Sequence, residues 1–163
     1  MMRIEVVAHE KIPLDLLLSA DPSEDNVRAH LRRSVAFAGT EAGRIVAAAL
    51  LELRGEAAEL HAIAVTADRQ GKGLGRELLA HALAHAADAG VRRVEVGTGN
   101  SSLRQVAFYQ RSGFRVVGVV PDFFAAYRPP IVEDGIPCRD MIRLACLLLS
   151  PDADAGSRPS VAG

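Results

Sequence analysis

The sequence of 163 residues contains no tryptophan, only two cysteines and an aromatic content of 4%. Cys138 and Cys146 have no second pair of cysteine or histidine residues at zinc-ligand spacing, and two cysteines do not make a disulfide framework. These absences exclude the common structural zinc sites and the disulfide-stapled scaffolds. We therefore expect reduced thiols and no metal.

An excess of either charge is also absent, because 19 basic residues face 20 acidic ones and the formal net charge is −1. Nucleic acids and anionic membranes require a basic excess that neutralises several phosphates, so we expect neither as a partner. No apolar run approaches the roughly 18 residues of a membrane-spanning helix. Met1 to Arg3 leads directly into an alternating strand pattern instead of a targeting leader. We expect a soluble, cytoplasmic protein.

What the sequence does contain is typical of one globular domain. Hydrophobic residues make up 49% and charged residues of both signs 24%, which allows one sizeable core but not two ordinary domains. We predict a single domain over residues 1–149. The tail, residues 150–163, is rich in small and polar residues and has too little apolar side chain to bury, so we predict that it is disordered.

Hydrophobic periodicity predicts alternating strands and helices. Period-two patterns bounded by turn residues predict strands, and apolar positions three and four apart predict helices. The expected strands cover 4–8, 34–39, 45–53, 58–66, 91–96, 114–120 and 140–149, the expected helices cover 13–19, 21–34, 74–90 and 101–112, and residues 121–139 form an ordered functional loop.

A glycine-rich turn, Gln70-Gly71-Lys72-Gly73-Leu74-Gly75, lies between a predicted strand and the longest predicted helix. Backbone N–H groups at a helix start attract anions, and glycine lets a phosphate approach the backbone closely. Lys72 and Arg76 would add positive charge. The spacing fits neither a nucleotide-triphosphate loop nor a dinucleotide fingerprint. On its own, the glycine cluster is equally compatible with a plain tight turn.

Two segments resemble the GNAT superfamily of N-acetyltransferases. Val65, four intervening residues, Gln70, Gly73, Leu74 and Gly75, followed by Leu78-Leu79, are similar to its acetyl-CoA signature, and Asn100 to Phe114, ending in Ala107-Phe108-Tyr109-Gln110-Arg111-Ser112-Gly113-Phe114, is similar to its second signature segment. The resemblance implies an α/β fold of the mixed, α+β type: a central, mostly antiparallel sheet of six to seven strands with helices on both faces.

The resemblance also implies how acetyl-CoA is held. Backbone N–H groups from Gly71 to Arg76 would bind its pyrophosphate, and the strand edge at Ile63, Ala64 and Val65 would pair with the pantetheine arm. Asn100 or Ser102 would contact the pantetheine amides. Asn100 lies two residues earlier than the asparagine of the family's commonest pattern, and its side chain could instead only hydrogen-bond the backbone of the turn. The acceptor amine would attack the thioester directly, without an acyl-enzyme.

Three residues are candidates for the chemistry. Tyr109 occupies the position of the family's tyrosine that protonates the departing thiolate, with core packing as the alternative. Glu59 and His61 lie two apart on one strand, so we expect them to share a face with Ile63 and Val65. Either could accept the amine proton, since histidine titrates near pH 6.5. A hydrogen-bonded sheet-face histidine is the alternative for His61.

The loop of residues 121–139 is expected to form one wall of the acceptor site. Its acids could attract an ammonium group and its aromatics could stack on an apolar acceptor; anchoring of the loop or a homodimer contact is the alternative. The predicted acceptor residues are Asp122, Phe123, Phe124, Tyr127, Glu133 and Asp134. We expect acetylation of a primary amine of a small molecule or peptide. A protein lysine or N-terminal amine, or a non-catalytic CoA-binding sensor, are the alternatives.

Overall fold

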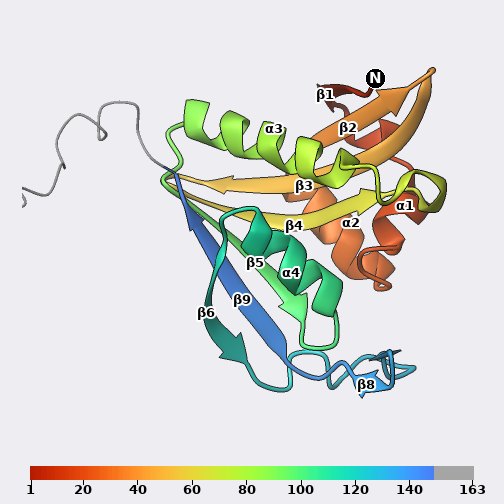
Figure 1. Ribbon diagram of the computed structural model, residues 1–163, viewed down its shortest axis with the longest axis vertical. Coiled ribbons are helices and arrows are strands. Elements are labelled where there is room, and N and C mark those ends of the chain that lie inside the picture. The colour runs from red at the N-terminus through yellow and green to blue at the C-terminus, as the bar shows by residue number, and fades with distance from the viewer. Residues whose placement is uncertain (149–163) are drawn as a thin grey trace, which may run out of the picture.

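The computed structural model describes residues 1–148 and contains a seven-stranded sheet with the strand order β1-β2-β3-β4-β5-β9-β6 (Figure 1). The predicted disordered tail lies outside the described residues. The elements are β1 (Arg3–Val7), η1 (His9–Lys11), α1 (Leu14–Leu18), α2 (Glu24–Arg33), β2 (Val35–Glu41), β3 (Arg44–Arg54), β4 (Ala57–Val65), η2 (Ala67–Arg69), α3 (Leu74–Asp88), β5 (Arg93–Gly99), α4 (Leu103–Arg111), β6 (Arg115–Val120), β7 (Val132–Glu133), β8 (Ile136–Pro137) and β9 (Met141–Leu147).

Short turns build the first half of the sheet. β2 and β3 are joined through Ala42 and Gly43, both with positive φ, and β3 and β4 are joined by Gly55 and Glu56, with Gly55 at φ 69°. Such two-residue connections favour antiparallel pairing of neighbouring strands. β2, β3 and β4 therefore form an antiparallel meander, and β1 pairs antiparallel with β2 at its edge.

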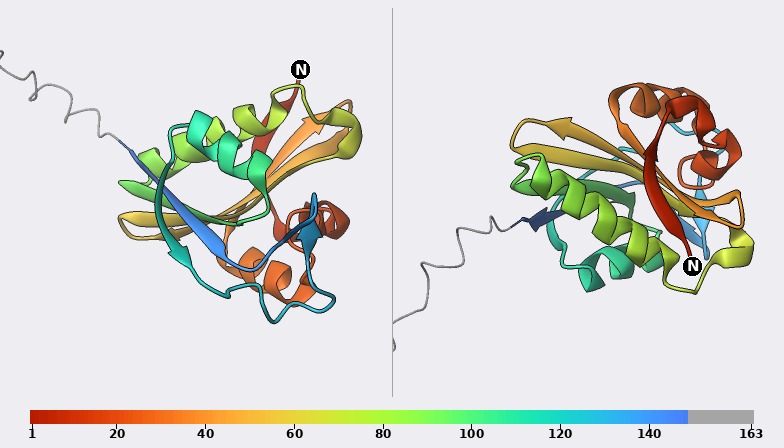
Figure 2. Two further views of the ribbon diagram at one scale, coloured as in Figure 1. Left: turned by 60° about the horizontal axis from the view of Figure 1, so that its bottom comes forward. Right: turned by 90° about the horizontal axis from the view of Figure 1, so that it is seen from above.

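Helices cover both faces of the sheet, as Figure 2 shows. One apolar cluster packs α3 and α4 against the sheet and includes Phe37, Leu78 and Tyr109. A second cluster packs α1 and α2 against the opposite face and includes Leu17 and Val27. The predicted mixed architecture with helices on both faces is confirmed. We call the side covered by α1 and α2 the α2 face.

A β-bulge in β4 reverses which side chains meet which face. Leu51 pairs with Leu60 and Leu50 with Ala62, so His61 is one residue more than β3 can match. Beyond this bulge the alternation shifts by one position. The prediction that Glu59 and His61 share a face with Ile63 and Val65 is therefore wrong. Glu59 and His61 contact residues of the α2 face, whereas Ile63 and Val65 pack in the cluster of α3 and α4.

β4 and β5 are parallel and pair only over their first halves. The last pair joins Leu60 to Val96, after which β4 stays paired with β3 and β5 with β9. We call this separation, between residues 61–65 and 97–99, the β4–β5 parting (Figure 1). It leaves one edge of each strand without a partner in the middle of the sheet, and such edges offer backbone groups to a ligand.

All seven predicted strands and four predicted helices are present, with ends that differ by a few residues. The hairpin of β7 and β8, inside the expected loop 121–139, was not predicted, because two-residue strands carry no periodicity. Among residues 1–148, no helix has the length and apolar character needed to cross a membrane.

Candidate active site

The glycine turn adopts the conformation that its sequence favours. Gly71 and Gly73 have φ values of 75° and 80°, in the left-handed region where glycine carries no steric penalty. Gly73 is the N-cap of α3, and the first backbone bond of the helix runs from the N–H of Glu77 to its carbonyl. The N–H groups of the first turn therefore have no partner within the helix, and they lie at the positive end of the helix dipole.

Gln70 shapes the turn from the side. Its Nε2 donates to the carbonyl of Val65 at 3.0 Å, which ties the turn back to the end of β4. Lys72 and Arg76 are exposed beside it. The turn thus joins an anion-binding helix start to the free edge of β4, where Ile63, Ala64 and Val65 lie in the β4–β5 parting.

Asn100 and Ser102 are both held by the loop of residues 121–139. The side chain of Asn100 donates to the Pro137 carbonyl at 3.1 Å, and its Oδ1 accepts from the N–H groups of Arg139 and Asp140 at 2.8 and 2.9 Å. Ser102 is the N-cap of α4 but makes no side-chain cap bond; its hydroxyl donates to Glu133 instead. In this structure both residues anchor the loop, and their contact with pantetheine stays a prediction.

Tyr109 lies on α4 with its ring in the core, only 5% exposed, between the rings of Phe108 and Phe114. Burial raises the pKa of its hydroxyl well above 10, so the phenol keeps its proton at any physiological pH. Core packing and hydrogen donation to a ligand are both compatible with this placement, because the ring can be buried while the hydroxyl points at a neighbouring group.

Glu59 lies in an ionic network on the α2 face. Its two oxygens accept from Arg143 at 2.7 Å and from Arg54 at 3.1 Å. Burial alone would raise the pKa of this carboxyl, but the hydrogen bond and charge of Arg143 outweigh burial and lower it. Glu59 is therefore held ionised, and a carboxylate with a lowered pKa is a weak proton acceptor.

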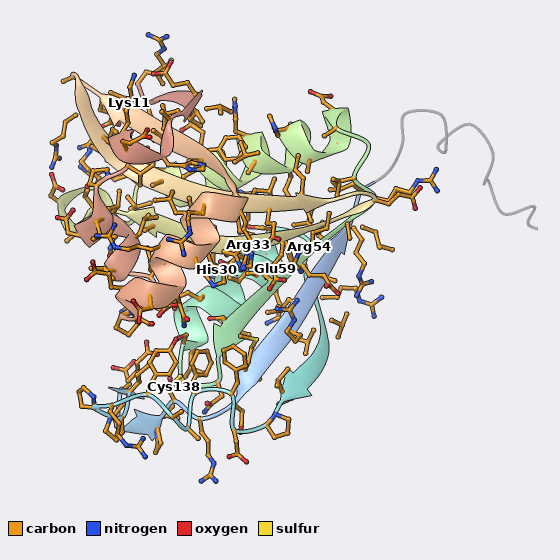
Figure 3. The ribbon with its side chains drawn as sticks, turned by 180° about the vertical axis from the view of Figure 1, so that it is seen from behind. Lys11, His30, Arg33, Arg54, Glu59 and Cys138 are labelled. Carbon is orange, nitrogen blue, oxygen red and sulfur yellow. The ribbon has the colours of Figure 1, made fainter. Side chains whose placement is uncertain are left out.

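His61 is the bulged residue and lies at the inner end of the β4–β5 parting. Its Nε2 is 2.6 Å from a carboxylate oxygen of Glu52, and its ring stacks on that of His30 with centroids 3.8 Å apart. Figure 3 shows His30 and Arg33, both of α2, close to Glu59 of β4. The structure thus brings both predicted bases to one place, together with residues that the sequence did not single out.

The loop of residues 121–139 docks on the start of α2 through Tyr127. The Tyr127 hydroxyl accepts from Nδ2 of Asn26 at 2.9 Å and donates to Oδ1 of Asp21 at 3.2 Å. Its ring contacts that of Phe124, which in turn packs against the ring of Phe123. The loop is therefore tied to the N-terminal end of α2.

Two of the three acids predicted to attract an ammonium group have partners within the chain. Asp122 is paired with Arg139, and Glu133 accepts from the hydroxyls of Ser101 and Ser102 at 2.9 and 2.8 Å. Their contact with an acceptor stays a prediction. Among residues 1–148, no group of three or more histidine, cysteine, aspartate or glutamate side chains could hold a metal ion.

Comparison with known proteins decides the family. The sequence model described as the Acetyltransferase (GNAT) family matches residues 6–114, more than half of the chain. The chain belongs to the GNAT family. It is 43% identical to an N-acetyltransferase of Bacillus subtilis strain 168 named YvbK. The match extends over 134 residues, which are 80% of this chain and 85% of that protein.

Solved GNAT structures have the same fold. An IAA acetyltransferase from Bacillus cereus is 43% identical with a TM-score of 0.86, over 91% of this chain and 100% of that one. A GNAT acetyltransferase from Elizabethkingia anophelis with acetyl-CoA bound is 35% identical with the same TM-score of 0.86, over 90% of this chain and 98% of that one. This GNAT protein is an acyltransferase with acetyl-CoA as its cosubstrate. The turn fits that ligand, because its free N–H groups suit a pyrophosphate.

Three residues that contact the candidate bases were not singled out by the sequence analysis: Glu52, His30 and Arg143. A signal for the first was present, because a two-residue turn at Gly55 and Glu56 sets Glu52 opposite Glu59. Two like charges facing each other are destabilising unless other groups compensate them. His30 and Arg143 come from α2 and β9, so only the tertiary fold reveals their place.

Proposed function

We propose that this GNAT protein transfers the acetyl group of acetyl-CoA to a primary amine of a small molecule or short peptide, by direct attack and without an acyl-enzyme. The observation that carries the proposal is the β4–β5 parting, which has the glycine turn beyond its outer end and His61 at its inner end. A thioester lying along the free edge of β4 would reach the α2 face beside a proton-accepting imidazole.

The reaction needs two proton transfers. The neutral amine nitrogen bonds to the acetyl carbon and loses one proton to His61, while the carbon–sulfur bond breaks and the thiolate takes a proton from the Tyr109 hydroxyl. His61 then releases its proton to solvent and Tyr109 regains one, so amine and acetyl-CoA give amide and CoA. Between the two candidate bases, the lowered pKa of Glu59 favours His61.

A small acceptor is supported by the loop of residues 121–139. A protein lysine or N-terminus requires an open groove, whereas Tyr127 fastens this loop to Asn26 of α2 and to Asp21 just before it. Phe124 and Tyr127 supply aromatic surface there. Because Asp122 and Glu133 are already paired, the wall offers apolar contacts more than free negative charge. An amine with an apolar or aromatic body fits these features best.

The test is a screen of primary amines for acetyl-CoA-dependent release of CoA, followed with a thiol reagent. The panel should contain arylalkylamines, alkylamines, polyamines, amino acids and a lysine peptide. We expect amine-dependent release with the aromatic and apolar amines, and its loss in a His61→Gln variant. CoA binding without release by any amine would favour the sensor alternative, and release only with the lysine peptide would favour a protein acceptor.

A further inference from the structure

The closest polar contact of His61 is with Glu52 of β3. Nε2 of His61 lies 2.6 Å from Oε2 of Glu52, and the two side chains are only 7% and 14% exposed. Glu52 pairs with Glu59, and His61 follows Glu59 by two positions, so ordinary strand alternation places the imidazole on the same α2 face as Glu52.

Glu52 is ionised, and this decides where His61 carries its hydrogen. Arg54 donates to the same carboxylate oxygen at 2.8 Å. The hydrogen bond from Arg54, followed by that from His61, lowers the pKa of Glu52 to about 2. An ionised carboxylate only accepts hydrogen bonds, so the Nε2 atom of neutral His61 must carry the hydrogen. Nδ1 is then left with a free lone pair.

His30, the other imidazole of the cluster, is poorly suited to accept the proton. Its ring lies parallel to that of His61 within 15°, and Arg33 lies 3.3 Å from its Nδ1. A guanidinium can only donate, so it occupies the lone pair of His30. Burial, then the neighbouring His61 and Arg33, lowers the pKa of His30. The contact with Arg33 and the lowered pKa both make His30 a poorer proton acceptor than an ordinary histidine.

We infer that Glu52 is a positioning residue, which fixes the tautomer of His61 so that Nδ1 accepts the proton of the attacking amine, and which stabilises the imidazolium that forms. The inference rests on the proposed function of His61 as the base. A carboxylate that holds one imidazole nitrogen orients the other and raises its basicity. Without Glu52, His61 would lose both the fixed tautomer and the stabilising negative charge.

Other charged groups face the same cluster and must stay constant in a test. They come from every element packed there: Asp21, His30 and Arg33 around α2, Arg54 on β3, Glu59 on β4 and Arg143 on β9. Glu52→Gln leaves all of them in place and keeps the shape of the side chain. Glu95→Gln is the matched control, because Glu95 is also a glutamate of the central sheet, with Arg93 and Arg143 as its partners.

The kinetic test compares pH profiles with one amine acceptor, so that the titration of the acceptor is common to all variants. We expect Glu52→Gln to lower kcat about ten- to a hundredfold with KM little changed, and to move the acid limb of kcat/KM about one pH unit lower. Glu52→Asp, which restores the charge, should recover the position of the limb. Glu95→Gln should match the parent. An unmoved acid limb in a folded Glu52→Gln variant would overturn the inference.

A spectroscopic test needs no acceptor. The ¹⁵N shifts of the His61 ring, assigned by loss of its signals in His61→Gln, report which nitrogen carries the hydrogen. We expect Nε2–H in the parent and a mixture of tautomers in Glu52→Gln. Nδ1–H in the parent would contradict our inference. The two proposals fail separately: full activity of His61→Gln removes the base of the proposed function, whereas an inactive His61→Gln beside a fully active Glu52→Gln removes only the role of Glu52.

Discussion

Arg143 of β9 reaches across β5 and donates from Nη1 to Oε1 of Glu59 on β4 at 2.7 Å, joining two residues 84 positions apart. Both side chains are mostly buried, at 20% and 17% exposure. Glu59 pairs with Glu95 of β5 just before the ladder between β4 and β5 ends, so the ion pair ties β4 to β9 across β5 at the start of the β4–β5 parting.

Removal of this arginine should therefore destabilise the fold. We expect Arg143→Met to lower the free energy of unfolding by about 2 kcal/mol, because Glu59 keeps only the more exposed Arg54 as a partner. Urea unfolding measures the change. Arg3→Met is the control, since the Arg3–Glu5 pair is exposed and should contribute under about 0.5 kcal/mol. Equal losses in the two variants would contradict the prediction.

Tyr109→Phe separates catalysis from packing. The ring stays in the core between Phe108 and Phe114, so stability and the Kd for CoA should change little. If the hydroxyl protonates the thiolate, kcat should fall about a hundredfold, the range of a lost general acid. Steady-state kinetics and CoA titration give the two numbers. Unchanged turnover would leave Tyr109 with a packing role alone.

Substitution by alanine should weaken acetyl-CoA binding at one glycine of the turn and leave it unchanged at another. Gly73→Ala places a side chain at φ 80°, which costs about 1–2 kcal/mol and distorts the helix start; we expect the Kd for acetyl-CoA to rise at least about tenfold. A Cβ on Gly75 would meet Val65 at 3.6 Å and Phe108 at 3.8 Å, which are ordinary contacts. Gly75→Ala should therefore bind acetyl-CoA normally. Similar affinities of both variants would argue against a conformational role for Gly73.

The contrast between these glycines and His61 shows how far the sequence alone could lead. Gly71 and Gly73 carry a local signal, since positive φ and a helix start are properties of a few neighbouring residues. The bulge at His61 has no such signal. The burial of side chains along Ala57–Val65 alternates without interruption. Only the register of this strand against β3 reveals the extra residue. Local patterns thus predicted the strands and helices, but not which face each half of β4 presents.

The ionic network of the site depends even more on the tertiary fold. Glu59 and His61 could be predicted as neighbours on one strand, and the turn at Gly55 could have added Glu52. His30 and Arg143 come from elements distant in the sequence, and no spacing rule links them to β4. The sequence therefore indicated the candidate bases but not the groups that set their protonation.

Tyr127→Phe tests whether the loop of residues 121–139 closes the acceptor site. The hydroxyl bridges Asn26 and Asp21, and burial, followed by the charge of Asp21, raises its pKa to about 12, so it donates over the whole working pH range. Its loss should cost about 1 kcal/mol of stability and raise KM for the amine. Asn26→Ala should reproduce part of the effect. An unchanged KM in both variants would show that the hydrogen bonds of Tyr127 do not shape the acceptor site.

The pH dependence of stability tests the state of Glu52. Its pKa is lowered from 4.5 to about 2 in the folded protein. A lowered carboxyl pKa stabilises the native state fully above the unfolded value, and this contribution is lost as the pH falls toward the folded value. The free energy of unfolding of the parent should therefore exceed that of Glu52→Gln by a constant amount near neutral pH, and the difference should shrink between about pH 5 and about pH 3. Urea titrations of both proteins across this range give the difference directly. A gap that stays constant down to the lowest pH would mean that Glu52 titrates normally, and that neither Arg54 nor His61 stabilises its charge.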